Sequence, residues 1–160
     1  MSIRPYQSTD WEKFIELDIE TGRASMDDAT AEQQTKFRQS WPEQIRALYK
    51  WSDAGPTTNN SLLLVLEADD GDYAGHLWVC EQDDFFSSER KLFITTIALA
   101  SKYRGRGWGK LLMQRAEAEA KSRGLNRIGL GVDATNEGAI ALYRSQGYKT
   151  MRLTMEYSLI

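Results

Sequence analysis

The chain has few residues that form covalent or metal-based cross-links. Among 160 residues there is one cysteine, Cys80. A single thiol forms neither an internal disulfide nor a cysteine-based metal cage. We therefore expect no bound metal, and the scarcity of cysteine fits a reducing compartment such as the cytoplasm.

Long apolar runs and a positive charge balance are also missing. No segment approaches the roughly 18 apolar residues of a membrane helix, and residues 1–5 lack the apolar run of a signal peptide. The net charge of −3 argues against general binding to nucleic acid. Hydrophobic residues at 41% and charged residues at 27% are ordinary for a globular protein. We expect a cytoplasmic protein with one domain spanning 1–160, and neither a membrane nor a nucleic acid as partner.

The charges are unevenly distributed along the chain. Residues 51–89 contain nine Asp and Glu and no Lys or Arg, whereas residues 90–116 contain seven Lys and Arg and no acid. Chance segregation of solvated faces accounts for such a pattern about as well as function does. The functional interpretation is one face for an anionic ligand and another that attracts a cation.

Hydrophobic periodicity predicts alternating strands and helices. A turn at 69–72 makes a hairpin of two early strands, and strand–helix–strand–helix–strand follows. This order predicts an α/β domain with three layers, a mixed central sheet flanked by helices. The expected strands are 3–6, 61–68, 73–81, 92–99, 128–132 and 151–159; the expected helices are 10–21 capped by Asp10, 31–52 broken at Trp41-Pro42, 107–123 and 137–146.

A glycine-rich loop, Arg104-Gly105-Arg106-Gly107-Trp108-Gly109, lies where a predicted strand passes into a predicted helix. Glycine lets backbone N–H groups approach phosphate oxygens closely, and the first N–H groups of the helix are also unpaired. Lys102 and Lys110 add positive charge beside the loop. These are the physical parts of a pyrophosphate site.

Two well-known phosphate-binding motifs do not fit this loop. A dinucleotide fingerprint requires glycine where Lys110 stands. A P-loop requires glycine where Arg104 stands, and serine or threonine where Leu111 stands. Both are excluded.

What remains, Arg-x-x-Gly-x-Gly, resembles the coenzyme A loop of the GNAT superfamily of acyl-CoA-dependent N-acetyltransferases. Leu99-x-x-x-Tyr103-Arg104-Gly105 is similar to the family's strand-to-loop transition. A second signature is similar downstream, at Asn136-x-x-Ala139-x-x-Leu142-Tyr143-x-x-x-Gly147-Tyr148. The resemblance covers the last 70 residues or so well. It implies a single-domain GNAT-like fold in which 1–90 mainly shapes the acceptor side and 91–160 binds acetyl-CoA as cosubstrate.

The resemblance also implies roles for individual residues. Tyr143 is the expected general acid, because a neutral phenol can donate a proton to the leaving sulfur. Asn136 is either a helix N-cap or a hydrogen-bond partner of the pantetheine arm, and it fills both roles only with separate atoms. The remaining expected contacts with acetyl-CoA are the main chain of Ile97, Ala98 and Leu99 and the loop residues Arg104, Gly105, Arg106, Gly107, Trp108, Gly109 and Lys110.

The sequence identifies no general base. Some family members carry a glutamate on the strand before the loop, where this chain has Thr95 and Thr96. Glu81, Asp72 and His76 on the predicted hairpin are the alternatives. For His76 we favour a buried, hydrogen-bonded structural role, and for Cys80 a place in the core.

The activity that the resemblance implies is transfer of an acetyl group from acetyl-CoA to a primary amine. The acidic segment 51–89 and Asp27-Asp28 favour a small cationic acceptor, although a peptide amine or an aminoglycoside-like amine fits the same charges. Trp41 and Trp51 are candidates for the acceptor pocket. The alternatives are a non-catalytic acyl-CoA-binding sensor or assembly module and a nucleotide-binding domain of another fold. A homodimer is a family-level expectation.

Overall fold

The computed structural model describes residues 1–23, 29–51, 59–84, 86–157 and 159, and for 23 and 49–51 the backbone alone. Short 3-10 turns, Ser8–Asp10 and Ser101–Tyr103, precede α1 and follow β4. The other elements are β1 (Ser2–Pro5), α1 (Trp11–Arg23), α2 (Ala31–Trp51), β2 (Ser61–Glu67), β3 (Tyr73–Asp83), β4 (Arg90–Leu99), α3 (Trp108–Ser122), β5 (Ile128–Leu130) and α4 (Glu137–Ser145).

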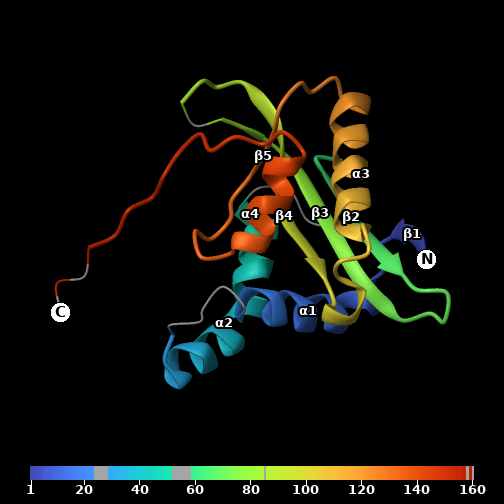
Figure 1. The fold of residues 1–160 in the computed structure, drawn as a ribbon, viewed down its shortest axis with the longest axis vertical. Coiled ribbons are helices and arrows are strands. Elements are labelled where there is room, and N and C mark those ends of the chain that lie inside the picture. Colours follow the sequence, from blue (N-terminus) through green and yellow to red (C-terminus); the bar gives the residue numbers. More distant parts are fainter. Residues whose placement is uncertain (24–28, 52–58, 85, 158, 160) are drawn as a thin grey trace.

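The strands form one mixed sheet in the order β1-β2-β3-β4-β5. Neighbours from β1 to β4 are antiparallel, and β4 and β5 are parallel. The two core clusters lie on opposite faces of this sheet: α1 and α2 cover one, and α3 with α4 covers the other (Figure 1). The expected three-layer α/β fold is therefore confirmed.

The strand pairings follow from the alternation of side chains along β2 and β3. Leu63 and Val65 face the α1 and α2 layer, whereas Leu66 faces α3. Because β2 and β3 are joined by a tight turn, they pair along almost their whole length, as expected for the predicted hairpin.

Strand β4 is paired unequally on its two edges. Its edge toward β3 is hydrogen-bonded from Arg90 to Leu99, with one register shift that leaves Thr95 as an extra residue. Its edge toward β5 is paired only from Leu92 to Ile94. Beyond Ile94, no described strand covers this edge of β4.

Two expectations about the N-terminal helices are wrong. Pro42 does not end a helix, because α2 continues from Ala31 to Trp51 with the proline inside it. Asp10 does not cap α1. Its carboxylate instead accepts hydrogen bonds from both terminal nitrogens of Arg4 and from the Gln7 N–H, each at 2.8 Å. The ion pair with Arg4 holds the Asp10 carboxylate away from the first N–H groups of α1.

The expected C-terminal strand is also wrong. Residues 149–157 form no strand, and Figure 1 shows this segment extending away from the sheet. The alternating apolar residues are exposed, with Met155 at 91% and Tyr157 at 85%. Period-two alternation favours a strand, but in the described part of the chain no neighbouring strand bonds to this segment.

Asp84 connects the loop after β3 and the start of β4 with the C-terminal segment, 68 residues further along the chain. Its side chain is 1% exposed and accepts hydrogen bonds from Lys91 Nζ at 2.7 Å and from Arg152 Nη2 at 2.9 Å. The backbone N–H groups of Phe86 and Ser87 also donate to it. Arg152 and Lys91 hold the pKa of Asp84 far below its ordinary 3.8.

A carboxylate with a lowered pKa stabilises the fold above its unfolded pKa and loses that contribution as the pH falls below it. We therefore expect Asp84→Asn to lower Tm at neutral pH, with a difference from the wild type that shrinks below pH 3.8. Thermal unfolding across a pH series tests this. The exposed neighbour Asp83 provides the control, Asp83→Asn, which changes the same charge and should leave Tm nearly unchanged; equal effects of the two variants would contradict the interpretation.

Candidate active site

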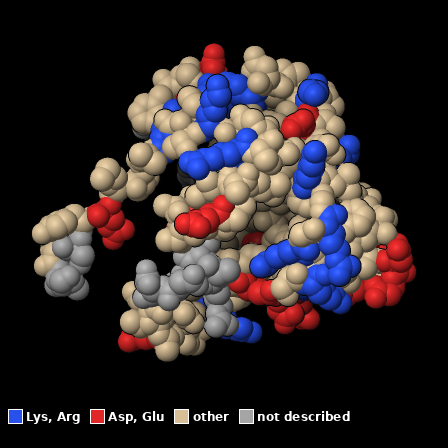
Figure 2. All heavy atoms as spheres, viewed as in Figure 1, with Lys and Arg blue, Asp and Glu red and all other residues tan. Residues whose placement is uncertain are grey.

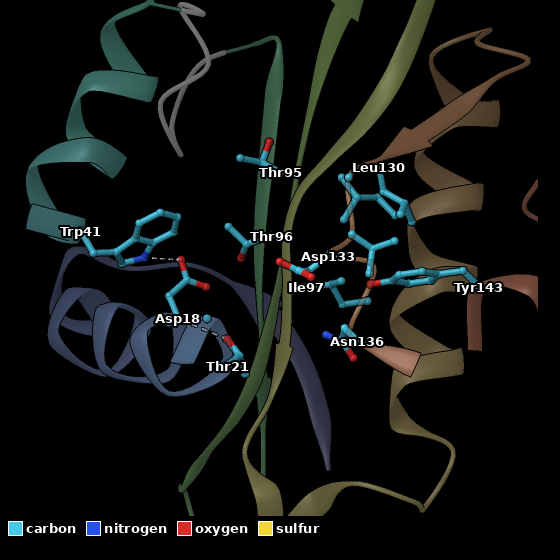
Figure 3. Close-up of a pocket in the computed structure, with 14 residues that line it drawn as sticks. Asp18, Thr21, Trp41, Thr95, Thr96, Ile97, Leu130, Asp133, Asn136 and Tyr143 are labelled. Atoms are coloured by element: carbon cyan, nitrogen blue, oxygen red, sulfur yellow. Dashed lines mark hydrogen bonds between the residues drawn. The ribbon is translucent and has the colours of Figure 1, made fainter. Parts of the chain in front are cut away.

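The unpaired edge of β4 opens onto a cavity of about 220 Å³. Five segments line it: β4 at 94–97, residues 130–133 from the end of β5 onward, α1, α2, and α4 with its N-cap Asn136. Figure 3 shows the side chains of Asp18 and Trp41 on one side of β4 and those of Asn136 and Tyr143 on the other. The cavity therefore draws on both helical layers.

The cavity exists because β4 and β5 separate. A bulge leaves its extra residue outside the regular ladder and bends the strand. Thr95 is that residue, and it and Thr96 line the cavity. The buried hydroxyl of Thr96 has no hydrogen-bond partner in the described chain. The Thr95 hydroxyl lies 3.3 Å from Cys80 Sγ, so the Thr96 hydroxyl is the group in this part of the wall that the described fold does not use.

The three residues expected to pair with pantetheine differ in their environments. Ile97 lines the cavity. The side chain of Ala98 is 3% exposed and packs in the core on the α1 face. The carbonyl of Leu99 accepts a hydrogen bond of 2.8 Å from Arg104 Nε. Of the three, only Ile97 borders the cavity.

Tyr143 reaches the cavity from α4. The residue is 9% exposed, its ring lies 6.0 Å from that of Tyr148 between centroids, and Figure 3 shows its hydroxyl directed toward the cavity. Burial raises the pKa of Tyr143 above its ordinary 10.0, so the phenol keeps its proton at neutral pH. The side chain is thus a protonated donor at the cavity wall.

Asn136 uses only one end of its amide within the fold. Its Oδ1 accepts a hydrogen bond of 3.1 Å from the Ala139 N–H and so caps α4. Its Nδ2 donates no hydrogen bond to a described residue, and Asn136 lines the cavity. Separate atoms are therefore available for the two roles that the sequence suggested.

The glycine loop has the backbone conformation of an anion site. Gly105 and Gly107 have positive φ values of 72° and 86°. Gly107 is the N-cap of α3 and gives no side-chain cap, so the first N–H groups of α3 remain unpaired. In Figure 2, Lys and Arg side chains gather over the segment between β4 and α3, beside a hollow in this face.

The remaining loop residues have distinct surroundings. A Cβ on Gly109 would lie 3.2 Å from Leu142, so this glycine permits close packing of α3 on α4. Trp108 packs against the α3-side core. Arg106 and Lys110 are exposed, and Arg104 Nη2 lies 3.9 Å from Glu20 in α1.

Two carboxylates at the cavity were not singled out from the sequence, Asp18 and Asp133. Asp133 is exposed, and hydrogen bonds from the backbone and hydroxyl of Thr135 lower its pKa. Asp18 is 4% exposed. The signal for Asp18 was its spacing: it follows Phe14 by four residues, on the apolar face of its helix, where a charge needs a reason.

The candidate bases of the hairpin lie away from the cavity. Glu81 is bound by Arg123 and Arg90, at 2.7 and 2.9 Å, and Asp72 by Lys102. His76 is fully buried and hydrogen-bonded, as expected. Cys80 is 6% exposed, which confirms its place in the core, and burial raises the pKa of its thiol.

The tryptophan and aspartate candidates for the acceptor side have mixed outcomes. Trp41 lines the cavity, and its Nε1 lies 3.4 Å from Asp18 Oδ2. Asp27, Asp28 and the side chain of Trp51 fall outside the described residues. Within the described part of the chain, no three His, Cys, Asp or Glu side chains are grouped to hold a metal ion. No helix described is both long and apolar enough to cross a bilayer.

The left-handed conformation at Gly107 leads to a stability prediction. A side chain at φ 86° is strained, so we expect Gly107→Ala to reduce the free energy of unfolding by about 1 kcal/mol. The control is Gly138→Ala in α4, where an added Cβ meets nothing within 4 Å. Alanine at position 138 should not lower the free energy of unfolding and should raise it by up to about 1 kcal/mol. Urea unfolding of both variants measures the difference, and equal losses would be inconsistent with strain at Gly107.

Comparison with known proteins agrees with this geometry. The model of the acetyltransferase (GNAT) family matches residues 26–148. The uncharacterized N-acetyltransferase YdgE of Bacillus subtilis is 30% identical over 105 residues, 66% of either chain. Streptothricin acetyltransferase of Streptomyces lavendulae is 35% identical over 79 residues, 49% of this chain and 40% of that protein.

A solved structure from Pyrococcus furiosus, described as an acetyl transferase, superposes with a TM-score of 0.78 at 24% identity and covers 99% of both chains. This structural likeness supports the fold alone. The family of the chain is assigned from the match to the family model. The chain belongs to the GNAT family of acetyltransferases and is an acyltransferase.

Proposed function

We propose that the protein transfers an acetyl group from acetyl-CoA to a primary amine of a small cationic acceptor. The observation that carries the proposal is the cavity itself. It brings the unpaired edge of β4, the free Nδ2 of Asn136 and the protonated phenol of Tyr143 together with two carboxylates. The comparisons establish the family, whose members differ in acceptor, so the acceptor here is argued from the residues.

The residues present fit acetyl-CoA. The first N–H groups of α3 and the positive-φ glycines of the loop suit the pyrophosphate, with Arg106 and Lys110 adding charge. Unpaired main-chain groups of β4 at Ile97 suit the amides of pantetheine, and Asn136 Nδ2 is a further donor toward them. The side chain of Arg104 is positioned by its hydrogen bond to the Leu99 carbonyl and does not depend on phosphate alone.

Acetyl-CoA supplies an activated thioester carbonyl. As the amine nitrogen bonds to that carbon, the carbon–sulfur bond breaks, and Tyr143 gives its proton to the departing sulfur. The nitrogen loses a proton to solvent, and solvent returns one to Tyr143. Burial supports this role, because the raised pKa keeps the phenol protonated until it is needed.

Charge supports a cationic acceptor. Asp18 and Asp133 line the cavity, and no described Lys or Arg does. A cavity with negative charge and no cation of its own favours a positively charged ligand. The relative named streptothricin acetyltransferase matches only half of this chain, so its name does not identify the acceptor.

Replacement of Tyr143 tests the proposed acid. We expect Tyr143→Phe to reduce kcat by roughly 10²-fold, because the thiolate must leave without a proton. Release of free thiol from acetyl-CoA, measured across a panel of amines, gives the rate. The dissociation constant for acetyl-CoA serves as the control and should hardly change, since the phenol hydroxyl acts on the leaving group.

Two results would count against the proposal. Thiol release by Tyr143→Phe at the wild-type rate would remove the phenol from the chemistry. Binding of acetyl-CoA by the wild type with no thiol release for any amine would favour the non-catalytic sensor.

A further inference from the structure

The buried carboxylate of Asp18 lies at the end of a hydrogen-bonded chain that the proposed chemistry does not use. His76 Nε2 is 2.9 Å from Asp18 Oδ1, and the hydroxyl of Tyr73 is 3.0 Å from His76 Nδ1. Trp41 Nε1 donates to the other oxygen of Asp18, at 3.4 Å. Tyr73, His76 and Asp18 are 8%, 0% and 4% exposed, so the chain is shielded from solvent except at the cavity.

The hydrogen bonds favour one arrangement of the protons. Burial raises the pKa of Tyr73 far above its ordinary value, so its hydroxyl keeps its proton and needs an acceptor. The described residues provide one, His76 Nδ1. With Nδ1 accepting, the imidazole is neutral and its Nε2–H donates to Asp18.

In this arrangement Asp18 receives hydrogen bonds from two neutral groups, an imidazole and an indole. No described Lys or Arg lies within ion-pair distance of it, and the remaining access to its carboxylate is through the cavity. Buried charges in proteins are normally paired. With His76 neutral, no described side chain carries the opposite charge for Asp18, and the cavity is where a ligand can supply it.

A cation held by Asp18 is a poor nucleophile. A nearby carboxylate stabilises the protonated form of an amine, and an ammonium nitrogen has no lone pair with which to attack a carbonyl. The nitrogen that reacts must therefore be a different one, close to Tyr143. In Figure 3, Asp18 and Tyr143 lie at opposite sides of the cavity, with Thr96 and Ile97 of β4 between them.

We propose that Asp18 is the binding site for a second, non-reacting ammonium group of the acceptor, which makes the preferred substrate a diamine. This inference rests on the proposed acetyltransferase function and adds the substrate class. His76 and Trp41 are positioning residues that hold the carboxylate toward the cavity, and the cation of the acceptor completes the ion pair.

The test compares putrescine with n-butylamine, which has the same carbon chain and no second amine. With the wild type we expect kcat/KM for putrescine to exceed that for butylamine roughly 10- to 100-fold, the range expected for a buried ion pair. Asp18→Asn keeps the shape and removes the charge, so its ratio should fall to about one, mainly through a higher KM for putrescine.

The matched control is Glu16→Gln, which removes a negative charge from the exposed side of the same helix. Its ratio should equal that of the wild type. Calorimetric titration with putrescine, in the presence of coenzyme A, adds a readout without turnover, and binding should weaken only in Asp18→Asn.

The outcomes separate the two proposals. If no amine causes thiol release by the wild type, the proposed function fails. If the wild type acetylates both amines equally well, the second-cation site is overturned even if Asp18→Asn does not fold. If the wild type prefers putrescine and both variants retain that preference, Asp18 is not its cause.

Discussion

The structure depends on a strand with two unequal edges. Along β4, nine of the ten residues from Arg90 to Leu99 pair with β3, while only three pair with β5. Burying a main-chain N–H or C=O group without a hydrogen bond costs free energy, so such groups normally face solvent or bind a ligand. Here they face a cavity. The extra residue at Thr95 bends β4 at the point where the two strands part.

Because β4 and β5 separate, residues from both halves of the chain form the walls of the cavity. On one side, α1 and α2 contribute a carboxylate and an indole; on the other, α4 contributes an amide and a phenol. The acidic and basic segments of the sequence also meet each other, since Lys91 binds Asp84 and Lys102 binds Asp72. Much of the charge segregation along the chain is thus used for ion pairs within the fold, and the cavity carboxylates stand apart from it.

The sequence predicted best what is encoded locally. The glycine loop, α3, β5 and α4 lie within one continuous segment, and the fold confirms their order and approximate ends. Asp18 was not predicted as a site residue because its hydrogen bond to His76 forms only in the folded chain. The two residues are 58 positions apart in the sequence. The C-terminal strand was wrong for a related reason: alternation at Met151 to Tyr157 sets a backbone preference, but a strand also needs a neighbour. Pro42 shows that a single unfavourable residue can be accommodated when the helix around it is packed, as α2 is through Ile45.

His76 is the chain's one histidine, and it lies one hydrogen bond behind the cavity wall. Its ring nitrogens therefore give a single set of imidazole resonances that need no mutagenesis to assign. A charge arriving at Asp18 changes how strongly Nε2–H is held, and that change is transmitted directly to those resonances. The fold thus contains a natural spectroscopic probe of what enters its cavity, on an imidazole that is one hydrogen bond removed from the carboxylate facing the ligand.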